Sequence, residues 1–408
     1  MICGLLGRTL GHSFSPEIHH FLGDYEYRLF EEEPENLEKF LKETPFSGIN
    51  VTIPYKKAVI PFCDELSDAA RILGAVNTIV RTEDGRLIGH NTDCSGFACL
   101  LKKSGIRPAG KKCLVLGSGG ASNTVCAVLR HFGGQVTVIS RTGENNYQNL
   151  DRHSDAALIV NTTPVGMYPN TEEAPLSLDP FPHLEGVLDV IYNPARTVLL
   201  LQAEARKIPA LNGLIMLVAQ AKESAEWFTG KSIPDEKTET IYHALRKKTE
   251  NVVLIGMPGA GKTTIGELLA RKMHRRFIDT DEKIIKLTGK SIDQIFREGG
   301  ESAFRHLETL MLREYANRTG VVLSTGGGCV TRKENYGFLH QNGQIFWIQR
   351  NLPDLPTDGR PLSQIQTPES LYAQRMPLYE AFADAAVCNQ AAPEDCCREI
   401  LEKWEELL

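Results

Sequence analysis

An apolar strand that runs into a glycine-rich turn and then a helix occurs twice in this chain, and this pattern constrains the fold most. The first copy, 112–121, reads Lys-Cys-Leu-Val-Leu-Gly-Ser-Gly-Gly-Ala, and the second, 251–264, reads Asn-Val-Val-Leu-Ile-Gly-Met-Pro-Gly-Ala-Gly-Lys-Thr-Thr. Turns of this kind present backbone N–H groups to phosphate at the start of a helix. Two such turns far apart predict two separate α/β units, each with a mostly parallel sheet.

Length and charge narrow the class of protein. A chain of 408 residues is long enough for two or three domains. The net charge of −6, without a basic excess in either half, argues against a nucleic-acid-binding protein. No apolar run approaches the roughly 18 residues needed to span a bilayer, and we recognise no secretory leader. We therefore expect a cytoplasmic chain whose ten cysteines are reduced thiols, and we interpret His19 and His20 as helix surface, not a metal site.

The second glycine turn is a specific nucleotide-binding signal. Residues 256–263 match the motif G-x-x-x-x-G-K-S/T at every fixed position, after a β-branched strand and before an amphipathic helix. We expect Lys262 to reach the terminal phosphates and the Thr263 hydroxyl to occupy a Mg²⁺ position. The alternative is a chance glycine loop. The motif does not by itself identify the reaction.

A pair of acids indicates the reaction type. Asp279 and Asp281 follow the apolar residues Phe277 and Ile278 at a predicted strand end, where ligands of α/β sheets bind. One carboxylate can hold Mg²⁺ through water, and the other can orient and deprotonate an attacking hydroxyl. This favours a kinase with a small-molecule acceptor. The alternative for either aspartate is a helix N-cap.

Further ligand-binding groups follow in the same half. Residues 326–328 form a triple-glycine turn after the apolar strand 321–325, where the backbone can approach a ligand closely. Arg305, Arg360 and Arg375 are each best explained singly as surface ion pairs. As a set they can clamp a carboxylate and phosphates, because planar guanidinium groups match both.

Residues 251–384 resemble shikimate kinase. The resemblance rests on the phosphate-binding motif, Phe277-Ile-Asp-Thr-Asp281, Gly300-Glu-Ser-Ala-Phe-Arg305 with Glu308, Thr325-Gly-Gly-Gly328, Arg360-Pro-Leu362 and Arg375-Met-Pro-Leu-Tyr379. It implies that shikimate is bound by Asp281, Arg305, Gly326, Gly327, Gly328 and Arg375. It implies that ATP is bound by Gly256, Gly259, Ala260, Gly261, Lys262, Thr263, Thr264 and Arg360. By the same resemblance Thr263 and Asp279 serve Mg²⁺, Arg360 on a closing lid stabilises the transferring phosphoryl group, and the catalytic residues are Asp281, Lys262 and Arg360.

The first glycine turn is weak evidence alone and gains weight from the strand after it. The strand 135–139 ends in Ser140-Arg141-Thr142, where NAD-specific sites carry an acid that holds the ribose hydroxyls. A serine there, with an arginine beside it and no acid that would repel a 2′-phosphate, favours NADP; the alternative is an exposed arginine in a turn. The residues predicted to bind NADP are Gly117, Gly119, Gly120, Ala121, Ser140, Arg141 and Thr142.

Two ionisable residues precede this turn. Hydride addition to a ketone needs a proton delivered to the oxygen, and a lysine held near an aspartate in a cleft can supply it. Lys56 follows Asn-Val-Thr-Ile-Pro-Tyr, and Asp93 ends Gly-His-Asn-Thr-Asp. The alternative is a surface lysine and a turn aspartate.

Residues 2 to about 230 resemble shikimate dehydrogenase. The matching segments are Gly11-His-Ser-Phe-Ser-Pro16, Asn50-Val-Thr-Ile-Pro-Tyr-Lys56, Gly74-Ala-Val-Asn77, Asn91-Thr-Asp93 and Met216-Leu-Val-Ala-Gln220. The resemblance implies that Lys56 and Asp93 form the catalytic pair. It implies that shikimate is bound by Ser13, Ser15, Asn50, Thr52, Asn77, Tyr192 and Gln220.

Together these features predict an α/β chain of three parts. A substrate-binding domain at 1–94, completed by 213–248, and a Rossmann-like NADP domain at 95–212 precede a P-loop, NMP-kinase-like domain at 250–408. The expected function is NADPH-dependent reduction of 3-dehydroshikimate, then MgATP-dependent phosphorylation of shikimate, in aromatic amino-acid biosynthesis. We expect small-molecule substrates and neither nucleic acid nor membrane as partner. The alternatives are an NAD-dependent quinate or shikimate dehydrogenase fused to the kinase, and a catalytically silent metabolite-sensing regulator.

Overall fold

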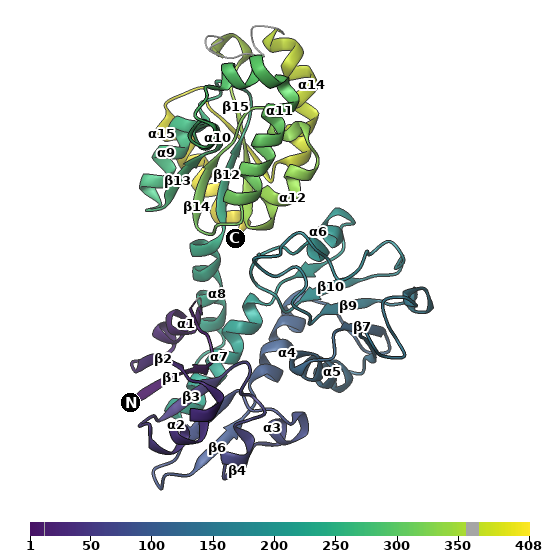
Figure 1. Cartoon of the computed structure of the whole chain (residues 1–408), viewed down its shortest axis with the longest axis vertical. Helices are drawn as coiled ribbons and strands as arrows, with labels where there is room; N and C mark the ends of the chain where they lie inside the picture. Colours follow the sequence, from purple (N-terminus) through teal and green to yellow (C-terminus); the bar gives the residue numbers. More distant parts are fainter. Residues whose placement is uncertain (12, 356–366) are drawn as a thin grey trace. The chain divides into compact units, whose positions relative to one another are not determined.

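The computed structural model describes residues 1–11, 13–355 and 367–408. The chain divides into two compact units, one comprising Met1–Tyr192 and Leu199–His243, the other Asn193–Val198 and Ala244–Leu408. The described part contains three sheets with helices between their strands, which confirms the predicted α/β class (Figure 1). None of the described helices is both long and apolar enough to cross a membrane.

The first sheet has six strands in the order β2-β1-β3-β5-β6-β4. β5 pairs antiparallel with both β3 and β6, whereas the other pairs are parallel. Its core side chains include Ile49, Val51 and Ile79, which are almost completely buried. The elements of this part are β1 (Ile2–Gly7), α1 (Ser15–Leu22), β2 (Glu26–Glu31), α2 (Leu37–Glu43), β3 (Gly48–Val51), β4 (Glu65–Leu66), α3 (Asp68–Leu73), β5 (Thr78–Arg81) and β6 (Leu87–His90).

The second sheet is parallel throughout, in the order β11-β10-β9-β7-β8. The inner strand β7, which pairs with β8 and β9, carries Leu114, Val115 and Leu116, all fully buried, as expected of a strand covered on both faces. The elements of this part are α4 (Asp93–Ser104), β7 (Lys112–Leu116), α5 (Gly120–His131), β8 (Gln135–Ile139), β9 (Leu158–Asn161), β10 (Gly186–Asp189), α6 (Val198–Ala205) and β11 (Ala210–Leu211).

Helix α7 (Leu214–Thr229) returns from the second sheet to pack on the first. It contacts β3, β5, α1 and α4. The approach is close at Gly48 in β3, where a Cβ atom would lie only 2.1 Å from the Phe228 ring. This return places residues of α7 beside the polar ends of β3 and β5.

The second unit contains a five-stranded parallel sheet in the order β13-β14-β12-β15-β16. Helices α9 and α15 pack together on one side, and α12 and α14 lie against β15 on the other (Figure 1). All five residues of β12 are buried. The elements are α8 (Glu236–Thr249), which begins in the first unit, then β12 (Asn251–Ile255), α9 (Lys262–Lys272), β13 (Arg276–Asp279), α10 (Thr280–Thr288), α11 (Ile292–Tyr315), β14 (Val321–Ser324), α12 (Glu334–Gln341), β15 (Gly343–Gln349), α14 (Pro368–Phe382), β16 (Ala385–Cys388) and α15 (Pro393–Leu407).

Candidate active sites

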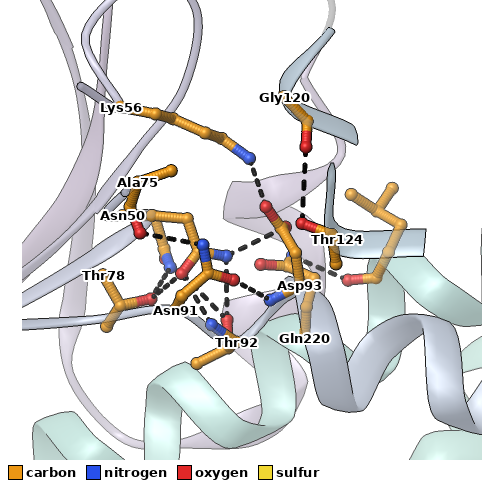
Figure 2. A network of polar contacts seen from close by, with 12 residues as sticks. Asn50, Lys56, Ala75, Thr78, Asn91, Thr92, Asp93, Gly120, Thr124 and Gln220 are labelled. Carbon is orange, nitrogen blue, oxygen red and sulfur yellow. Dashed lines mark hydrogen bonds and ion pairs between the residues drawn. The ribbon is translucent and has the colours of Figure 1, made fainter. Parts of the chain in front are cut away.

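The first candidate site is built around an ion pair. The ammonium of Lys56 lies 2.6 Å from Oδ2 of Asp93, and Figure 2 shows the lysine reaching across to the carboxylate. Their side chains are 31% and 16% exposed, so the pair is shielded but reachable from solvent. The structure therefore brings together two residues that are 37 positions apart in the chain.

Local structure holds each partner in place. Lys56 lies in the loop after β3, where its backbone carbonyl accepts a hydrogen bond from the Val76 N–H at 2.7 Å. Asp93 is the first residue of α4, and its own N–H donates to Oδ1 of Asn91 at 3.1 Å. The positive end of the helix dipole stabilises a carboxylate at this position.

Asn77 supports the other carboxylate oxygen. Its Nδ2 donates to Oδ1 of Asp93 at 2.9 Å, and its Oδ1 accepts from the Thr92 N–H at 2.8 Å. Asn77 is 3% exposed. One oxygen of Asp93 thus faces an amide and the other faces the lysine, which fixes the carboxylate plane.

Asn50 belongs to the same buried network. Its Nδ2 donates to the hydroxyls of Thr78 and Ser224 at 3.2 and 2.8 Å, and its Oδ1 accepts from the Tyr27 hydroxyl at 2.7 Å. The Thr78 hydroxyl donates to Oδ1 of Asn77 at 3.1 Å. Asn50 is therefore linked to the ion pair through Asn77, with both of its polar atoms already engaged.

The predicted serines form a second cluster at the start of α1. The Ser15 N–H donates to Oγ of Ser13 at 3.1 Å, and the ring between them, Phe14, lies 5.8 Å from the ring of Tyr192. Burial raises the pKa of Tyr192, so its hydroxyl stays protonated and can donate to a carboxylate.

Two further predicted residues lie near these groups. Thr52 directly follows β3 and is half-buried, with its N–H bonded to the Leu6 carbonyl at 2.9 Å. Gln220 lies on α7, and its Nε2 donates to the Leu217 carbonyl of the same helix at 2.8 Å (Figure 2). That bond uses one of the two Nε2 hydrogens, so the amide still carries a second hydrogen that a substrate can accept.

The expectation that His19 lies on a helix surface is wrong. His19 is 1% exposed, and its ring stacks on Tyr27 at a centroid distance of 4.0 Å. Burial lowers its pKa to about 3, so the ring is neutral. The error arose because α1 packs against α7 through this side, which the sequence of α1 does not reveal.

The first glycine turn fits a dinucleotide phosphate. Gly117 has φ +105°, which favours glycine, and a Cβ there would lie 3.0 Å from Thr162 and Thr163. A Cβ on Gly119 or Gly120 would meet nothing within 4 Å, so the start of α5 is open to a ligand. A phosphate can therefore approach the backbone at the positive end of this helix. Ala121 follows in the first turn of α5 and is half-buried.

The residues after β8 fit an additional phosphate. Ser140 is half-buried, whereas Arg141 and Thr142 are exposed. Ser140, with Arg141 beside it, stands where an acid holds the ribose of NAD in sites specific for that cofactor. An exposed guanidinium at this point suits the 2′-phosphate of NADP.

The second candidate site is a cavity of about 490 Å³ at the carboxyl ends of β12, β13 and β14. The phosphate-binding loop forms one wall, with φ values of +145°, +84° and +97° at Gly256, Gly259 and Gly261. The Lys262 ammonium donates to the carbonyls of Gly256 and Met257 at 2.9 and 3.0 Å. These contacts hold the loop in a shape that suits phosphate. The cavity is lined by Pro258, Gly259, Gly261, Lys262, Thr263, Thr264, Asp279, Asp281, Ile292, Phe296, Phe304, Arg305, Ser324, Thr325, Gly326, Gly327, Gly328, Arg350 and Arg375.

Thr263 and Asp279 meet in this cavity. The Thr263 hydroxyl donates to Oδ2 of Asp279 at 2.8 Å. Oδ1 of Asp279 accepts from the N–H groups of Asp281 and Glu282, so Asp279, not Asp281, caps α10. A hydroxyl beside a carboxylate next to a phosphate loop is a donor set that Mg²⁺ accepts when phosphates complete its shell.

Asp281 is buried among charges. Burial, then the carboxylates of Glu308 and Asp279, raise its pKa to about 7, against the lowering effect of Lys262 and Arg305. Its Oδ1 has no hydrogen-bond partner in the described protein. A carboxyl group in this state can accept a proton at neutral pH and suits a general base.

Arg305 is held from behind by two glutamates of the same helix. Its Nη1 donates to Oε2 of Glu308 at 2.6 Å, and its Nε and Nη2 donate to Oε1 of Glu301 at 3.2 and 3.1 Å. Three of the five guanidinium N–H groups are thus engaged, which leaves one on each Nη for a ligand. Glu308 is fully buried. Its position three residues after Arg305 on one helix is the sequence feature that indicates this ion pair.

The triple-glycine turn closes the cavity. A Cβ on Gly326 would lie 2.3 Å from Oε1 of Glu308, and one on Gly328 would lie 2.0 Å from the Arg305 guanidinium. The Gly327 carbonyl accepts from Nη1 of Arg375 at 3.1 Å and from the Tyr379 hydroxyl. Only glycines allow these charged groups to pack so close to the turn.

Three further residues were predicted to bind ATP in the kinase half. Ala260 is fully buried in the phosphate loop, and Thr264 lines the cavity. Arg360 lies outside the described residues. Arg350 also lines the cavity and was not predicted from the sequence. Its Nη1 donates to the Gly259 carbonyl at 3.3 Å, because the fold brings the end of β15 beside the phosphate-binding loop.

Comparison with known families agrees with both sites. Residues 258–405 match the family model described as shikimate kinase, and residues 5–79 match the shikimate dehydrogenase substrate binding domain. A relative named shikimate dehydrogenase (NADP(+)) from Clostridium beijerinckii is 35% identical over 259 residues. The match covers 59% of this chain and 96% of that relative.

Solved structures agree. A chorismate mutase/shikimate 5-dehydrogenase fusion protein from Clostridium acetobutylicum is 35% identical, with a TM-score of 0.58 over 60% of this chain and 97% of that one. A shikimate 5-dehydrogenase from Thermus thermophilus, solved with NADP(H) and shikimate, is 33% identical, with a TM-score of 0.55 over 60% of this chain and 99% of that one. The chain therefore belongs to the shikimate dehydrogenase family and carries a shikimate kinase domain in its C-terminal part.

Proposed function

We propose that this chain is a bifunctional shikimate-pathway enzyme that reduces 3-dehydroshikimate to shikimate and then phosphorylates shikimate to shikimate 3-phosphate. Its cofactors are NADP(H), ATP and Mg²⁺, and its partners are small-molecule substrates. The proposal is carried by one observation: each family's motif residues gather at a site of their own, one an ion pair and one a cavity. Family membership supports both enzyme activities.

In the dehydrogenase, Lys56 supplies the proton. NADPH, when held by the turn after β7 and by Arg141, would supply the hydride for the carbonyl carbon. The Lys56 ammonium donates a proton to the carbonyl oxygen as negative charge develops there, and Asp93 holds the ammonium toward that oxygen. Because Lys56 is 31% exposed, it regains a proton from solvent. Ser13, Ser15 and Tyr192 present uncharged hydroxyls to the substrate carboxylate.

In the kinase, Asp281 acts on the acceptor hydroxyl. The bound MgATP provides the phosphoryl group. The Asp281 carboxylate accepts the proton of the attacking hydroxyl, and Lys262 neutralises charge on the phosphates. Arg305 and Arg375 bind the shikimate carboxylate through the N–H groups that remain after their contacts with protein.

The decisive experiment removes one site at a time from the intact chain. Lys56→Met should lower the rate of NADPH oxidation by 3-dehydroshikimate by about 100-fold or more, because the positioned proton donor is lost, and leave phosphorylation unchanged. Arg305→Met should lower the rate of shikimate phosphorylation and leave NADPH oxidation unchanged. Lys57→Met and Arg297→Met are the control variants, since Lys57 is the exposed residue next to Lys56 and Arg297 is an exposed arginine of α11, the helix that carries Arg305.

The outcomes separate the alternatives. Loss of both activities in either variant, with the fold intact, contradicts the assignment of one site to each reaction. A wild-type chain that oxidises NADH faster than NADPH, or that prefers quinate, is instead a catabolic dehydrogenase. A chain that binds shikimate without turnover is a regulator.

A further inference from the structure

We propose that Ser224 on α7 is a positioning residue of the dehydrogenase, which acts through Thr92 and Asn77 on the carboxylate of Asp93. The inference deepens the proposed function and rests on it. Ser224 lies one helical turn after Gln220, is 0% exposed and belongs to none of the motifs that identified the site.

Ser224 has an unusual number of polar partners for one hydroxyl. Its Oγ lies 2.9 Å from the Gln220 carbonyl, 2.8 Å from Nδ2 of Asn50, 2.8 Å from the Thr78 hydroxyl and 3.1 Å from the Thr92 hydroxyl. These partners come from α7, β3, β5 and the start of α4. A single side chain therefore joins the returning helix to β3, β5 and the start of α4.

The shortest contacts of this network fit one arrangement of its hydrogens, although the Thr92 hydroxyl also lies 3.3 Å from Oδ1 of Asn77. Ser224 donates to the Gln220 carbonyl and accepts from Asn50 and Thr92. Thr78 accepts the second Asn50 hydrogen and donates to Oδ1 of Asn77. Each of the three hydroxyls then donates once, and no buried hydrogen is left without an acceptor.

This arrangement sets the direction of the Asn77 amide. With its Oδ1 occupied by the Thr92 N–H and the Thr78 hydroxyl, the two Nδ2 hydrogens must point to Thr92 Oγ1 at 3.0 Å and Asp93 Oδ1 at 2.9 Å. The flipped amide would direct its oxygen at the carboxylate. Ser224 supports the observed direction because it offers the Thr92 hydroxyl an acceptor at 3.1 Å, closer than Oδ1 of Asn77 at 3.3 Å, and so leaves that Oδ1 to the Thr92 N–H and the Thr78 hydroxyl.

A purely structural role for Ser224 would require only its bond to the Gln220 carbonyl. Serine and threonine in helices commonly bond to the carbonyl four residues earlier, without any function. Thr229 does this on the same helix, where its hydroxyl donates to the Ala225 carbonyl at 2.8 Å. Ser224 differs because its other contacts lead to Asp93.

The test is a mutant cycle on the full chain, assayed as NADP-linked oxidation of shikimate. Ser224→Ala should lower kcat about tenfold, because the Asn77 amide is released and Asp93 loses its fixed plane. Thr92→Val removes the hydroxyl that links Ser224 to Asn77 and should give a similar loss. The double variant should lose no more than either single variant, and Thr229→Ala should behave as wild type.

Several outcomes decide the matter. An unfolding temperature of the first unit that stays unchanged in every variant, measured by calorimetry, shows that the unit carrying Ser224 is folded. Unaltered kcat in Ser224→Ala, or losses that multiply in the double variant, overturns the inference even when the wild type is active. An inactive wild type overturns the proposed function instead.

Discussion

At the scale of single residues, burial decides what the carboxylates of the kinase site can do. Asp281 shares its surroundings with Glu308 and Asp279, and burial followed by their negative charge raises its pKa to about 7. Glu308 is itself held by Arg305 at 2.6 Å. A free aspartate would stay ionised at neutral pH, whereas Asp281 exchanges its proton there.

The first prediction concerns the pH dependence that follows from this pKa. Below about pH 7 Asp281 holds its proton and cannot act as a base, so the phosphorylation rate should fall as the pH is lowered through 7. A raised carboxyl pKa contributes stability at low pH that is lost as the pH rises toward 7. Asp281→Asn should therefore abolish phosphorylation and gain stability over wild type between pH 4 and pH 7, measured by denaturant unfolding. A stability difference independent of pH contradicts this.

The second prediction concerns Tyr379, which is fully buried and stacks on Trp347. Its hydroxyl and Arg375 both donate to the Gly327 carbonyl, which turns the Gly328 N–H the opposite way, since the trans peptide is planar. Tyr379→Phe should lower kcat/KM for shikimate about tenfold with the KM for ATP unchanged. Steady-state kinetics with each substrate varied in turn measures this. Equal effects on both substrates would indicate general loosening.

At the scale of elements, the turns after β7 and β12 both present backbone to a phosphate, but their glycines are required for different reasons. Gly117 needs glycine for its backbone, with φ +105° and neighbours at 3.0 Å, whereas Gly119 has open space where a Cβ would lie. Gly256 and Gly261 have positive φ and crowded surroundings. The same sequence feature, a glycine after a strand, thus has two physical causes.

The third prediction separates these causes in the dehydrogenase turn. Gly117→Ala should lower both thermal stability and NADP affinity, because its backbone is strained and its Cβ meets Thr162 and Thr163. Gly119→Ala should leave the stability of the ligand-free chain unchanged and weaken NADP binding about tenfold or more, since its methyl enters the space of the phosphate. Calorimetric unfolding and NADP titration measure the pair. Identical behaviour of the two variants would disprove the distinction.

At the scale of the whole molecule, the chain holds two compact units whose boundary falls within α8. Each unit has its own sheet cores and its own candidate site. A ligand that binds only the folded state stabilises the part of the protein that it contacts.

The fourth prediction is that each nucleotide stabilises one unit. NADP should raise the temperature of one calorimetric transition, and ADP with Mg²⁺ should raise that of another. At a ligand concentration of about 100 times Kd, each ligand should add about 2.7 kcal/mol to the free energy of unfolding of its own unit. Lys262→Met, which removes the phosphate-loop cation, should abolish the ADP effect and keep the NADP effect. One transition shifted by either ligand contradicts separate units.

The sequence alone determined the two phosphate-binding turns, the α/β class and the family motifs, because these depend on residues adjacent in the chain. A glycine run after a β-branched strand has few conformations, and the local pattern of Gly, Lys and Thr carries its chemistry. The sequence also supplied the candidates Lys56 and Asp93, but it left open whether they meet.

Only the tertiary structure decided what depends on contacts between distant segments. It placed Asp93 2.6 Å from Lys56, buried His19 against Tyr27, and gave the cap of α10 to Asp279. It also brought Ser224, from the returning helix, into contact with Asn50, a partner 174 residues away. Burial and hydrogen-bond partners are properties of packed surfaces, and no local pattern encodes which surface a side chain will meet.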